Sequence, residues 1–281
     1  MAGGDPTASD VNADNNAQGP TSTSDDWRLD VITRLATDSS DGHFKEGARL
    51  VVVTASKNRR GDIVSFEQPS AAAMAINIAH RAAVHAMELQ PRIAFSEASS
   101  FMGPGTSVTT ATTPALFDYF EQCMVAATFS FQALEAYSNY IIDRNVKEGG
   151  YPYTRRKGEV VNLSAMDLER QASTEEKLGI ILPDLLGMAS PKKKKVWNKF
   201  KLLKDKSDAT IHIKSVDQAP RMKRPEDLSR MSLFMGFIGA DIIAWPKDAM
   251  EVIHYFARRD MVYPWMEHLL DQFGIPREPS D

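Results

Sequence analysis

The sequence predicts a mainly α-helical protein, in which a helical bundle surrounds one long central helix and a small β-hairpin lies near the N-terminus. Three observations support this prediction. From residue 114 onward, apolar residues recur at alternating spacings of three and four, which indicates one face of a helix about 30 residues long. Shorter segments on both sides show the same spacing. Residues 50–66 carry two β-branched runs separated by a polar turn.

The composition divides the 281 residues into three regions. Residues 1–26 hold five aspartates and no lysine or arginine, and their apolar surface is too small to offset the entropy of ordering. They are therefore predicted to form a disordered acidic tail. Residues 27–113 are predicted to be an N-terminal segment with the hairpin and one helix, and residues 114–281 to be the helical bundle.

The N-terminal segment contains three predicted elements. The runs at 50–53 and 63–66 flank a polar turn and predict the hairpin. A helix is predicted to begin after Ser70 and to end or kink at Pro91. Its apolar face consists of Ile76, Ala79, Ala83 and Met87. Residues 103–113 are rich in glycine, threonine and serine and are interpreted as a connector.

The central helix is predicted to start near Pro114 and to end before Gly149 and Gly150. Its apolar stripe consists of Phe117, Phe120, Met124, Ala127, Phe131, Leu134, Ser138 and Ile141. Residues 151–157 are basic and aromatic, and they predict a loop.

Further helices are predicted after this loop. Ser173 and Glu176 fit a capping box that opens a short helix, and Gly187 ends it. Pro191 fits the first turn of the next helix. That helix carries Val196, Trp197, Phe200 and Leu203 on one face. The last helices are predicted at residues 228–244, 246–258 and 265–273.

Composition argues against several classes of protein. A net charge of −4 argues against a protein that coats nucleic acid non-specifically. No apolar stretch reaches the roughly 20 residues of a membrane span, and the first residues lack the features of a secretory signal. The single cysteine, Cys123, lies in an apolar helical pattern and is expected to be buried. We therefore expect a cytoplasmic protein without a membrane partner.

No known metal or cofactor motif is present in the sequence. The histidines lack the paired spacing of a zinc or iron site. Gly103-Pro104-Gly105 lacks the lysine and the third glycine of phosphate-binding loops, and the Gly-x-Ser-x-Gly motif of serine hydrolases is absent. We expect no metal and no cofactor.

The charge is distributed unevenly. Residues 192–214 hold nine lysines and two aspartates in a chain that is acidic overall. Such a surface attracts phosphates, and RNA is the expected partner. The candidate nucleic-acid-binding residues are Lys192, Lys193, Lys194, Lys195 and Lys199. The alternative is an ordinary solvated helix face.

His212 has the most suggestive setting of the histidines. If the helix continues this far, Asp208 lies on the same face and can accept a hydrogen bond from the ring, which favours the protonated form. This arrangement suits a general acid or base. The alternative is that His212 caps the helix end, where the helix dipole favours an imidazolium.

Taken in order, several segments resemble the HEPN-like helical-bundle proteins of microbes. The resemblance lies in residues 129–139, 175–183, 197–200 and 208–214, and it covers about half of the chain. It implies an all-α bundle that forms a homodimer, and it implies that catalytic members cleave RNA without a metal. Their signature is an arginine, four to six further residues and a histidine.

His212 matches the histidine of that signature. The arginine position falls on Ser207, which the polar Asp208 follows, or on Lys206 if the spacing is one residue longer. Lysine supplies a charge without the two-pronged grip of arginine, whereas serine supplies none. The resemblance therefore implies either a metal-independent endoribonuclease, with His212, Lys206 and Asp208 as catalytic candidates, or a degenerate relative that does not cleave.

Glu135 and Asn139 form a polar pair on the central helix. They are candidates to support the site by reaching toward His212, or alternatively they bond to neighbouring backbone. The leading hypothesis is an RNA- or phosphate-binding HEPN-like protein. The alternative is a non-enzymatic module for interaction with a protein partner or for assembly.

Overall fold

The computed structural model describes residues 26–34, 37–40, 42, 45–100, 103–155, 157–213, 233–257 and 263–277. In these residues the protein is mainly α-helical, as predicted. The predicted acidic tail lies outside the described residues, apart from Asp26.

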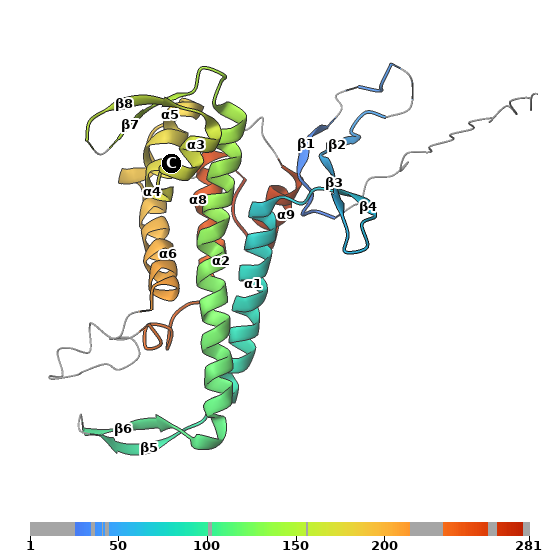
Figure 1. Cartoon of the computed structure of the whole chain (residues 1–281). Coiled ribbons are helices and arrows are strands. Elements are labelled where there is room, and N and C mark those ends of the chain that lie inside the picture. Colours follow the sequence, from blue (N-terminus) through green and yellow to red (C-terminus); the bar gives the residue numbers. More distant parts are fainter. Residues whose placement is uncertain are drawn as a thin grey trace, which may run out of the picture.

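Within the described residues, four longer helices and one shorter helix near the C-terminus make up most of the structure (Figure 1). The long ones are α1 (Ala71–Leu89), α2 (Thr113–Asn145), α6 (Lys195–Ile211) and α8 (Ala244–Phe256), and the terminal one is α9 (Pro264–Phe273). The short helices are α3 (Ala165–Gln171), α4 (Thr174–Glu176) and α5 (Leu182–Leu186). Helix α2 packs against α1, α6 and α8. Helix α6 runs antiparallel to α2.

The described strands form antiparallel pairs of two strands each. They are β1 (Val31–Arg34) with β2 (Arg49–Val51), β3 (Val53–Lys57) with β4 (Ile63–Glu67), β5 (Phe95–Ser100) with β6 (Gly103–Val108), and β7 (Tyr151–Thr154) with β8 (Val160–Leu163). The predicted hairpin is confirmed as β3 and β4. The predicted run at 50–53 is divided, because β2 pairs with β1 and β3 pairs with β4.

Two predicted loops are strands. The connector at 103–113 begins with β6, and the loop at 151–157 begins with β7. Both segments contain proline or glycine, which weaken a central strand but are tolerated where a strand has a free edge. In a pair of two strands each strand has such an edge, so Pro104 lies opposite Ser99 and Pro152 opposite Asn162.

Small residues let α1 and α2 pack closely along their length. Helix α1 begins at Ser70, whose Oγ accepts a hydrogen bond from the Ala73 amide at 3.3 Å. Its buried face is mostly alanine: Ala72, Ala73, Ala75, Ile76, Ala79, Ala82, Ala83, Ala86 and Leu89. Helix α2 adds the buried Ala126, Ala127 and Ala133. Short side chains reduce the distance between helix axes, and this contact fixes the long axis of the molecule.

The long helix predicted from Pro114 is confirmed as α2, but its predicted apolar stripe is only partly buried. Phe117 is 58% exposed, whereas Tyr119 and Cys123 are buried. Burial raises the pKa of the Cys123 thiol to about 12 despite a hydrogen bond with Tyr119, so this cysteine is a buried apolar residue as predicted. The buried side chains of α2 cover more than one face because helices pack on several of its sides.

The segment after α2 follows most of the predicted signals. The capping box is confirmed, since Ser173 Oγ accepts from the Glu176 amide at 3.2 Å and Glu176 Oε2 accepts from the Ser173 amide at 2.8 Å. A π-helical turn, Lys177–Ile181, then joins α4 to α5. Gly187 ends α5 with a φ of 62°.

One predicted helix is wrong in its described part. Residues 233–239 form turns rather than the expected helix of residues 228–244, whose first residues lie outside the described part of the chain. Gly236 and Gly239 lie in these turns, and Gly239 has a φ of 76°, which does not continue a helix. The last two predicted helices are confirmed as α8 and α9.

One hydrophobic core joins most of the described helices and the strand β8. It extends from Ala72 in α1 to Ile275 after α9, and therefore takes residues from both sides of the predicted boundary at residue 113. Among the described helices, none combines the length and the apolar character needed to cross a bilayer.

Candidate functional site

The lysine-rich segment contains four consecutive exposed lysines. Lys192 and Lys193 lie in a 3-10 turn, Pro191–Lys193, and Lys194 and Lys195 start α6. No ion pair joins these four side chains to another described residue. Lys194 is the N-cap of α6 and makes no capping hydrogen bond through its side chain. Four ammonium groups therefore surround the positive end of a 17-residue helix.

A glycine positions one of these lysines. A Cβ atom on Gly179 in the π-helical turn would lie 2.5 Å from Lys192 Cε and 2.9 Å from the Trp197 ring. The absence of a side chain at this position therefore lets the aliphatic part of Lys192 lie against the turn. The ammonium group is then held at the surface.

The other lysines of α6 are largely neutralised. Lys199 Nζ lies 2.8 Å from Asp248 Oδ1 and also contacts Glu251, both on α8. Burial lowers the pKa of Lys199, but the hydrogen bonds to these carboxylates outweigh it and the pKa lies above its usual value. Lys199, a predicted nucleic-acid-binding residue, thus joins α6 to α8.

Two further lysines of α6 are paired in the same way. Lys201 Nζ lies 3.1 Å from Glu175 Oε2, and Lys204 Nζ lies 2.8 Å from Asp208 Oδ2. Fewer lysines of residues 192–214 therefore carry an unpaired positive charge than the sequence suggests.

The predicted catalytic residues lie at the other end of α6, and no hydrogen bond joins the side chains of His212, Lys206 and Asp208 to one another. His212 is exposed and is the C-cap residue, and its amide donates to the Asp208 carbonyl at 2.9 Å. The Asp208 carboxylate accepts from Lys204 instead of from the His212 ring. Lys206 Nζ donates to the Gly236 carbonyl at 3.1 Å. Ser207, at the arginine position of the signature, is only 1% exposed.

The lysines and His212 are far apart. At a rise of about 1.5 Å per residue, His212 lies about 25 Å along the axis from Lys195, the first residue of the 17-residue helix α6. The structure therefore does not bring the predicted binding and catalytic residues into one cleft within a chain.

Asn139 bonds to a buried lysine and not to the His212 region. Lys177 Nζ donates to Asn139 Oδ1 at 2.8 Å and to the Glu169 carbonyl at 2.7 Å. Burial lowers the pKa of Lys177, which is 1% exposed, although the charges of Glu135 and Glu169 oppose this effect. Glu135 itself is exposed.

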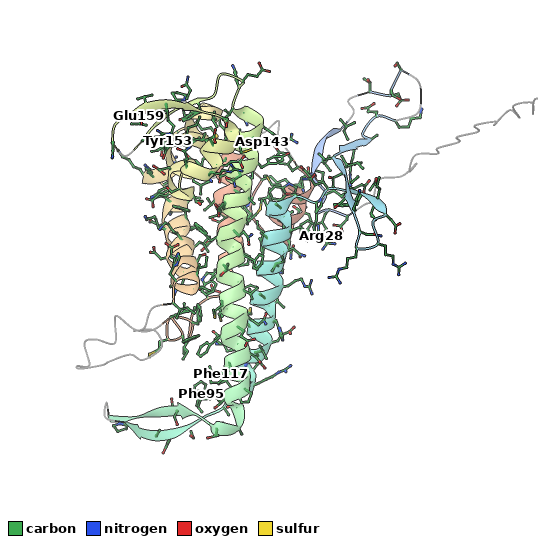
Figure 2. The ribbon with its side chains drawn as sticks, viewed as in Figure 1. Arg28, Phe95, Phe117, Asp143, Tyr153 and Glu159 are labelled. Atoms are coloured by element: carbon green, nitrogen blue, oxygen red, sulfur yellow. The ribbon has the colours of Figure 1, made fainter. Side chains whose placement is uncertain are left out.

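The end of α6 that carries His212 lies beside the start of α2. There the Tyr119 hydroxyl donates to the Phe237 carbonyl at 2.8 Å, next to the Gly236 carbonyl that binds Lys206. Along α2, Glu135 is 16 residues, or about 24 Å, beyond Tyr119. The idea that Glu135 and Asn139 reach toward His212 is therefore wrong. Figure 2 shows exposed aromatic residues at this end of the molecule, Phe117 on α2 and Phe95 on the β5–β6 hairpin.

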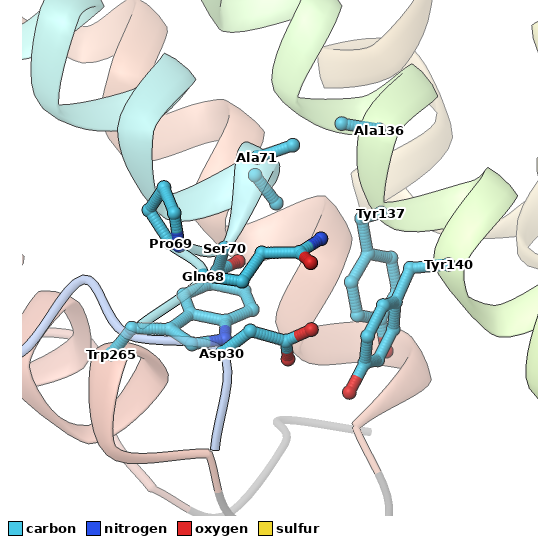
Figure 3. A pocket seen from close by; sticks show the side chains of 10 residues that line it. Asp30, Gln68, Pro69, Ser70, Ala71, Ala136, Tyr137, Tyr140 and Trp265 are labelled. Atoms are coloured by element: carbon cyan, nitrogen blue, oxygen red, sulfur yellow. The ribbon is translucent and has the colours of Figure 1, made fainter. Parts of the chain in front are cut away.

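A cavity that the sequence did not indicate lies between the N-terminal strand region, α1, α2 and α9 (Figure 3). Its volume is about 100 Å³. Its polar and aromatic lining includes Asp30, Gln68, Ser70, Tyr137, Tyr140 and Trp265. These residues come from four distant parts of the sequence, so no local motif connects them.

Comparison with known proteins gave no match, whether with protein-family models, with curated proteins or with solved structures.

Proposed function

We propose that this chain is a HEPN-like helical protein that binds RNA through Lys192, Lys193, Lys194 and Lys195 and does not cleave it. In this proposal the helices form a bundle organised around α2, because α1, α6 and α8 all contact it. The order of the segments that resemble the family supports the kinship, and the exposed lysines support the binding.

The observation that carries the proposal is the contrast between two groups of lysines on the same helix. Lys199, Lys201 and Lys204 are held by carboxylates, whereas the four lysines at the start of α6 make no ion pair with a described residue. The positive end of the helix dipole adds to their charge instead of opposing it. Clustered positive charge of this kind attracts the phosphates of a nucleic acid, and it releases condensed counterions on binding.

The surroundings of His212 argue against cleavage. A proton-transfer histidine in this chemistry needs a neighbouring cation that holds the scissile phosphate. Lys206 donates to a backbone carbonyl, Asp208 pairs with Lys204, and Ser207 is buried. An exposed imidazole without these partners at a helix C-terminus fits a capping role.

Binding is tested by fluorescence anisotropy with an unstructured RNA oligomer at several salt concentrations. The double variant Lys194→Gln/Lys195→Gln should bind more weakly, and the slope of log affinity against log salt should fall by about 1.4, or 0.7 for each lost phosphate contact. The control, Lys201→Gln/Lys204→Gln, removes the same charge from paired lysines and should leave the slope nearly unchanged. Equal effects of the two variants would contradict the proposal.

Cleavage is tested separately, by incubating the same RNA with the protein in EDTA. We expect intact RNA. Degradation that is lost in His212→Ala would show that the chain is an active nuclease and would overturn the second half of the proposal.

Assembly into a homodimer is the second candidate. Phe117, Ile211 and Ile238 are each more than half exposed, and they belong to α2, α6 and the turns at 233–239, which meet at one end of the molecule. Large exposed apolar side chains on elements that contact one another are candidates for an interface between two copies of the chain. Sedimentation that gives a monomer at all concentrations would reject this candidate.

A further inference from the structure

The cavity of Figure 3 is enclosed on one side and open on the other. Gln68, Pro69 and Ala71 are exposed and form its mouth, whereas Asp30 and Trp265 are buried and form its base. The segment with Asp30 is fixed in place on both sides. The Trp27 ring stacks on the His268 ring of α9, with 4.4 Å between the ring centroids. Leu29 forms an isolated antiparallel β-bridge with Pro69, just before α1. The cavity is therefore a feature of the folded core.

Asp30 is a largely buried residue without a matching cation. Asp30 is only 8% exposed, and no described lysine, arginine or histidine forms an ion pair with it. Arg28, two residues earlier, is bonded to Asp26. Arg144 lies over the Tyr140 ring, 4.4 Å from its centroid, and makes no ion pair with Asp30. A largely buried carboxylate that has no partner and faces an open cavity favours the binding of a cation.

The start of α1 offsets this charge only in part. Ser70, the N-cap of α1, lines the same cavity. A helix N-terminus carries roughly half a positive charge. The cavity therefore keeps a net negative character.

A second polar group in the cavity is also without a partner. The Tyr137 side chain is fully buried, and its hydroxyl forms no hydrogen bond within the described structure. In Figure 3 the side chains of Asp30 and Gln68 extend toward Tyr137 and Tyr140. Burial raises the pKa of Tyr137, so the phenol is neutral and its oxygen is free to accept a hydrogen bond.

The walls of the cavity are aromatic. Trp265, Tyr137 and Tyr140 all line it, and aromatic faces attract cations through their quadrupole. The cavity volume of about 100 Å³ is large enough for a small organic group. An ammonium with two or three small carbon groups fits this volume, and the rest of a longer chain can leave through the mouth.

The geometry points to a binding site for an alkylammonium group, with Asp30 as the counter-ion, Tyr137 as a hydrogen-bond acceptor, and Trp265 and Tyr140 as aromatic walls. This site is separate from the lysines at the start of α6, and it does not depend on RNA binding. Two sources share this chemistry: a free small amine, and a lysine side chain of another protein.

The test is calorimetric titration of the full chain with butylammonium chloride. Saturable binding at one site is expected, with no such signal from sodium chloride or sodium butyrate at equal concentration. Asp30→Asn should weaken binding by about 30-fold or more, because it removes one partner of a buried charge pair. Tyr137→Phe keeps the ring and should weaken binding about fivefold. The control Asp38→Asn removes an exposed carboxylate that pairs with Lys45 and should bind like the parent protein.

Two outcomes would overturn this inference. The first is no saturable binding of butylammonium, or equal binding of sodium ions. The second is that Asp30→Asn binds butylammonium as tightly as the parent protein does. If Asp30→Asn does not fold, the same result with Tyr137→Phe would overturn the inference. A lysine peptide and its acetylated form distinguish the two sources. Binding of the lysine peptide alone indicates a protein ligand, binding of butylammonium without the peptide indicates a free amine, and equal binding of the acetylated peptide contradicts ammonium recognition.

Discussion

Two buried charges in this molecule have opposite surroundings. The ammonium of Lys177 is 1% exposed and donates to Asn139 and to the Glu169 carbonyl. Asp30 is 8% exposed as a residue, and its carboxylate receives no hydrogen bond from a described side chain. Folding removes most of each residue from water, but only the charge of Lys177 has bonding partners within the described protein. The first site therefore stabilises the fold, and the second has unused capacity to bind.

This comparison separates burial from function. Lys177 has a lowered pKa and lies in a π-helical turn, and both features often accompany active sites. Yet its hydrogen bonds hold α2, α3 and the π-helical turn together and leave no opening to a substrate in the described structure. Asp30 lies in an open cavity, and its carboxylate has no hydrogen-bond partner among the described side chains. The two sites are therefore distinguished by whether the charged group already has hydrogen-bond partners.

The largest expected effect follows from removing the partner of Lys177. Asn139→Leu should lower the free energy of unfolding by about 3 kcal/mol, because the buried ammonium then keeps one protein acceptor. Urea denaturation measures this change. The double variant Asn139→Leu/Lys177→Met should be more stable than Asn139→Leu alone, since it also removes the stranded charge. If the double variant is less stable than the single variant, the cost of Asn139→Leu does not come from leaving the Lys177 ammonium without its partner.

A change of opposite sign is expected at the other site. Without an added amine, Asp30→Asn should raise the free energy of unfolding by about 1 kcal/mol, because a neutral amide of the same shape replaces an unpaired buried carboxylate. For a chain of this size the melting temperature should rise by about 2 °C. Butylammonium should stabilise the parent protein and not the variant. A destabilised variant would show that Asp30 already has a structural partner.

Local signals in the sequence predicted most of the helices. The spacing of apolar residues identified α1 and α2, and the capping box at Ser173 was confirmed atom by atom. Such signals depend on neighbours a few residues apart, so one sequence contains them completely. The hairpins at β5 and β7 were missed because a strand's partner, and not its own residues, decides whether glycine and proline are tolerated.

The candidate site was less predictable for a related reason. The run of lysines was visible in the sequence, but the carboxylates that neutralise Lys199 lie 49 and 52 residues later on α8. Nothing near Lys177 indicated that its side chain is buried. The sequence around Asp30 mixes polar and apolar residues without a recognisable motif. Tyr137 and Tyr140, which line the same cavity, lie more than a hundred residues later in the chain. Long-range packing created both buried charges.

Two histidines show the same contrast between a group with a hydrogen-bond partner and a group without one. Burial lowers the pKa of both His80 and His254. His254 Nε2 lies 3.1 Å from the Arg277 carbonyl, whereas Nδ1 of His80 is buried with no partner in the described structure. Because the unfolded state takes up protons first as the pH falls below about 6.5, both residues make the fold less stable in acid.

His80→Phe should reduce this acid sensitivity. The substitution keeps an aromatic ring against Phe273, whose centroid lies 5.2 Å from that of His80, and it removes the titrating group. The loss of unfolding free energy between pH 7.5 and pH 5.5 should shrink by less than about 1.4 kcal/mol, since the ring is only partly buried and solvent screens its charge. The measurement is urea denaturation at the two pH values. An unchanged pH dependence would assign the effect to His254 or to another group.

The smallest effect is expected at Glu135, whose charge acts on Lys177 from the surface. Its carboxylate is exposed and forms no hydrogen bond to the ammonium, so water and salt screen the attraction. Glu135→Gln should therefore change the free energy of unfolding by less than about 0.5 kcal/mol, and added salt should remove the difference. A cost comparable to that of Asn139→Leu would mean that long-range charge, and not direct hydrogen bonding, stabilises the buried lysine. Lys177 and Asp30 would then differ in the electrostatic attraction from distant charges, and not in whether they have hydrogen-bond partners.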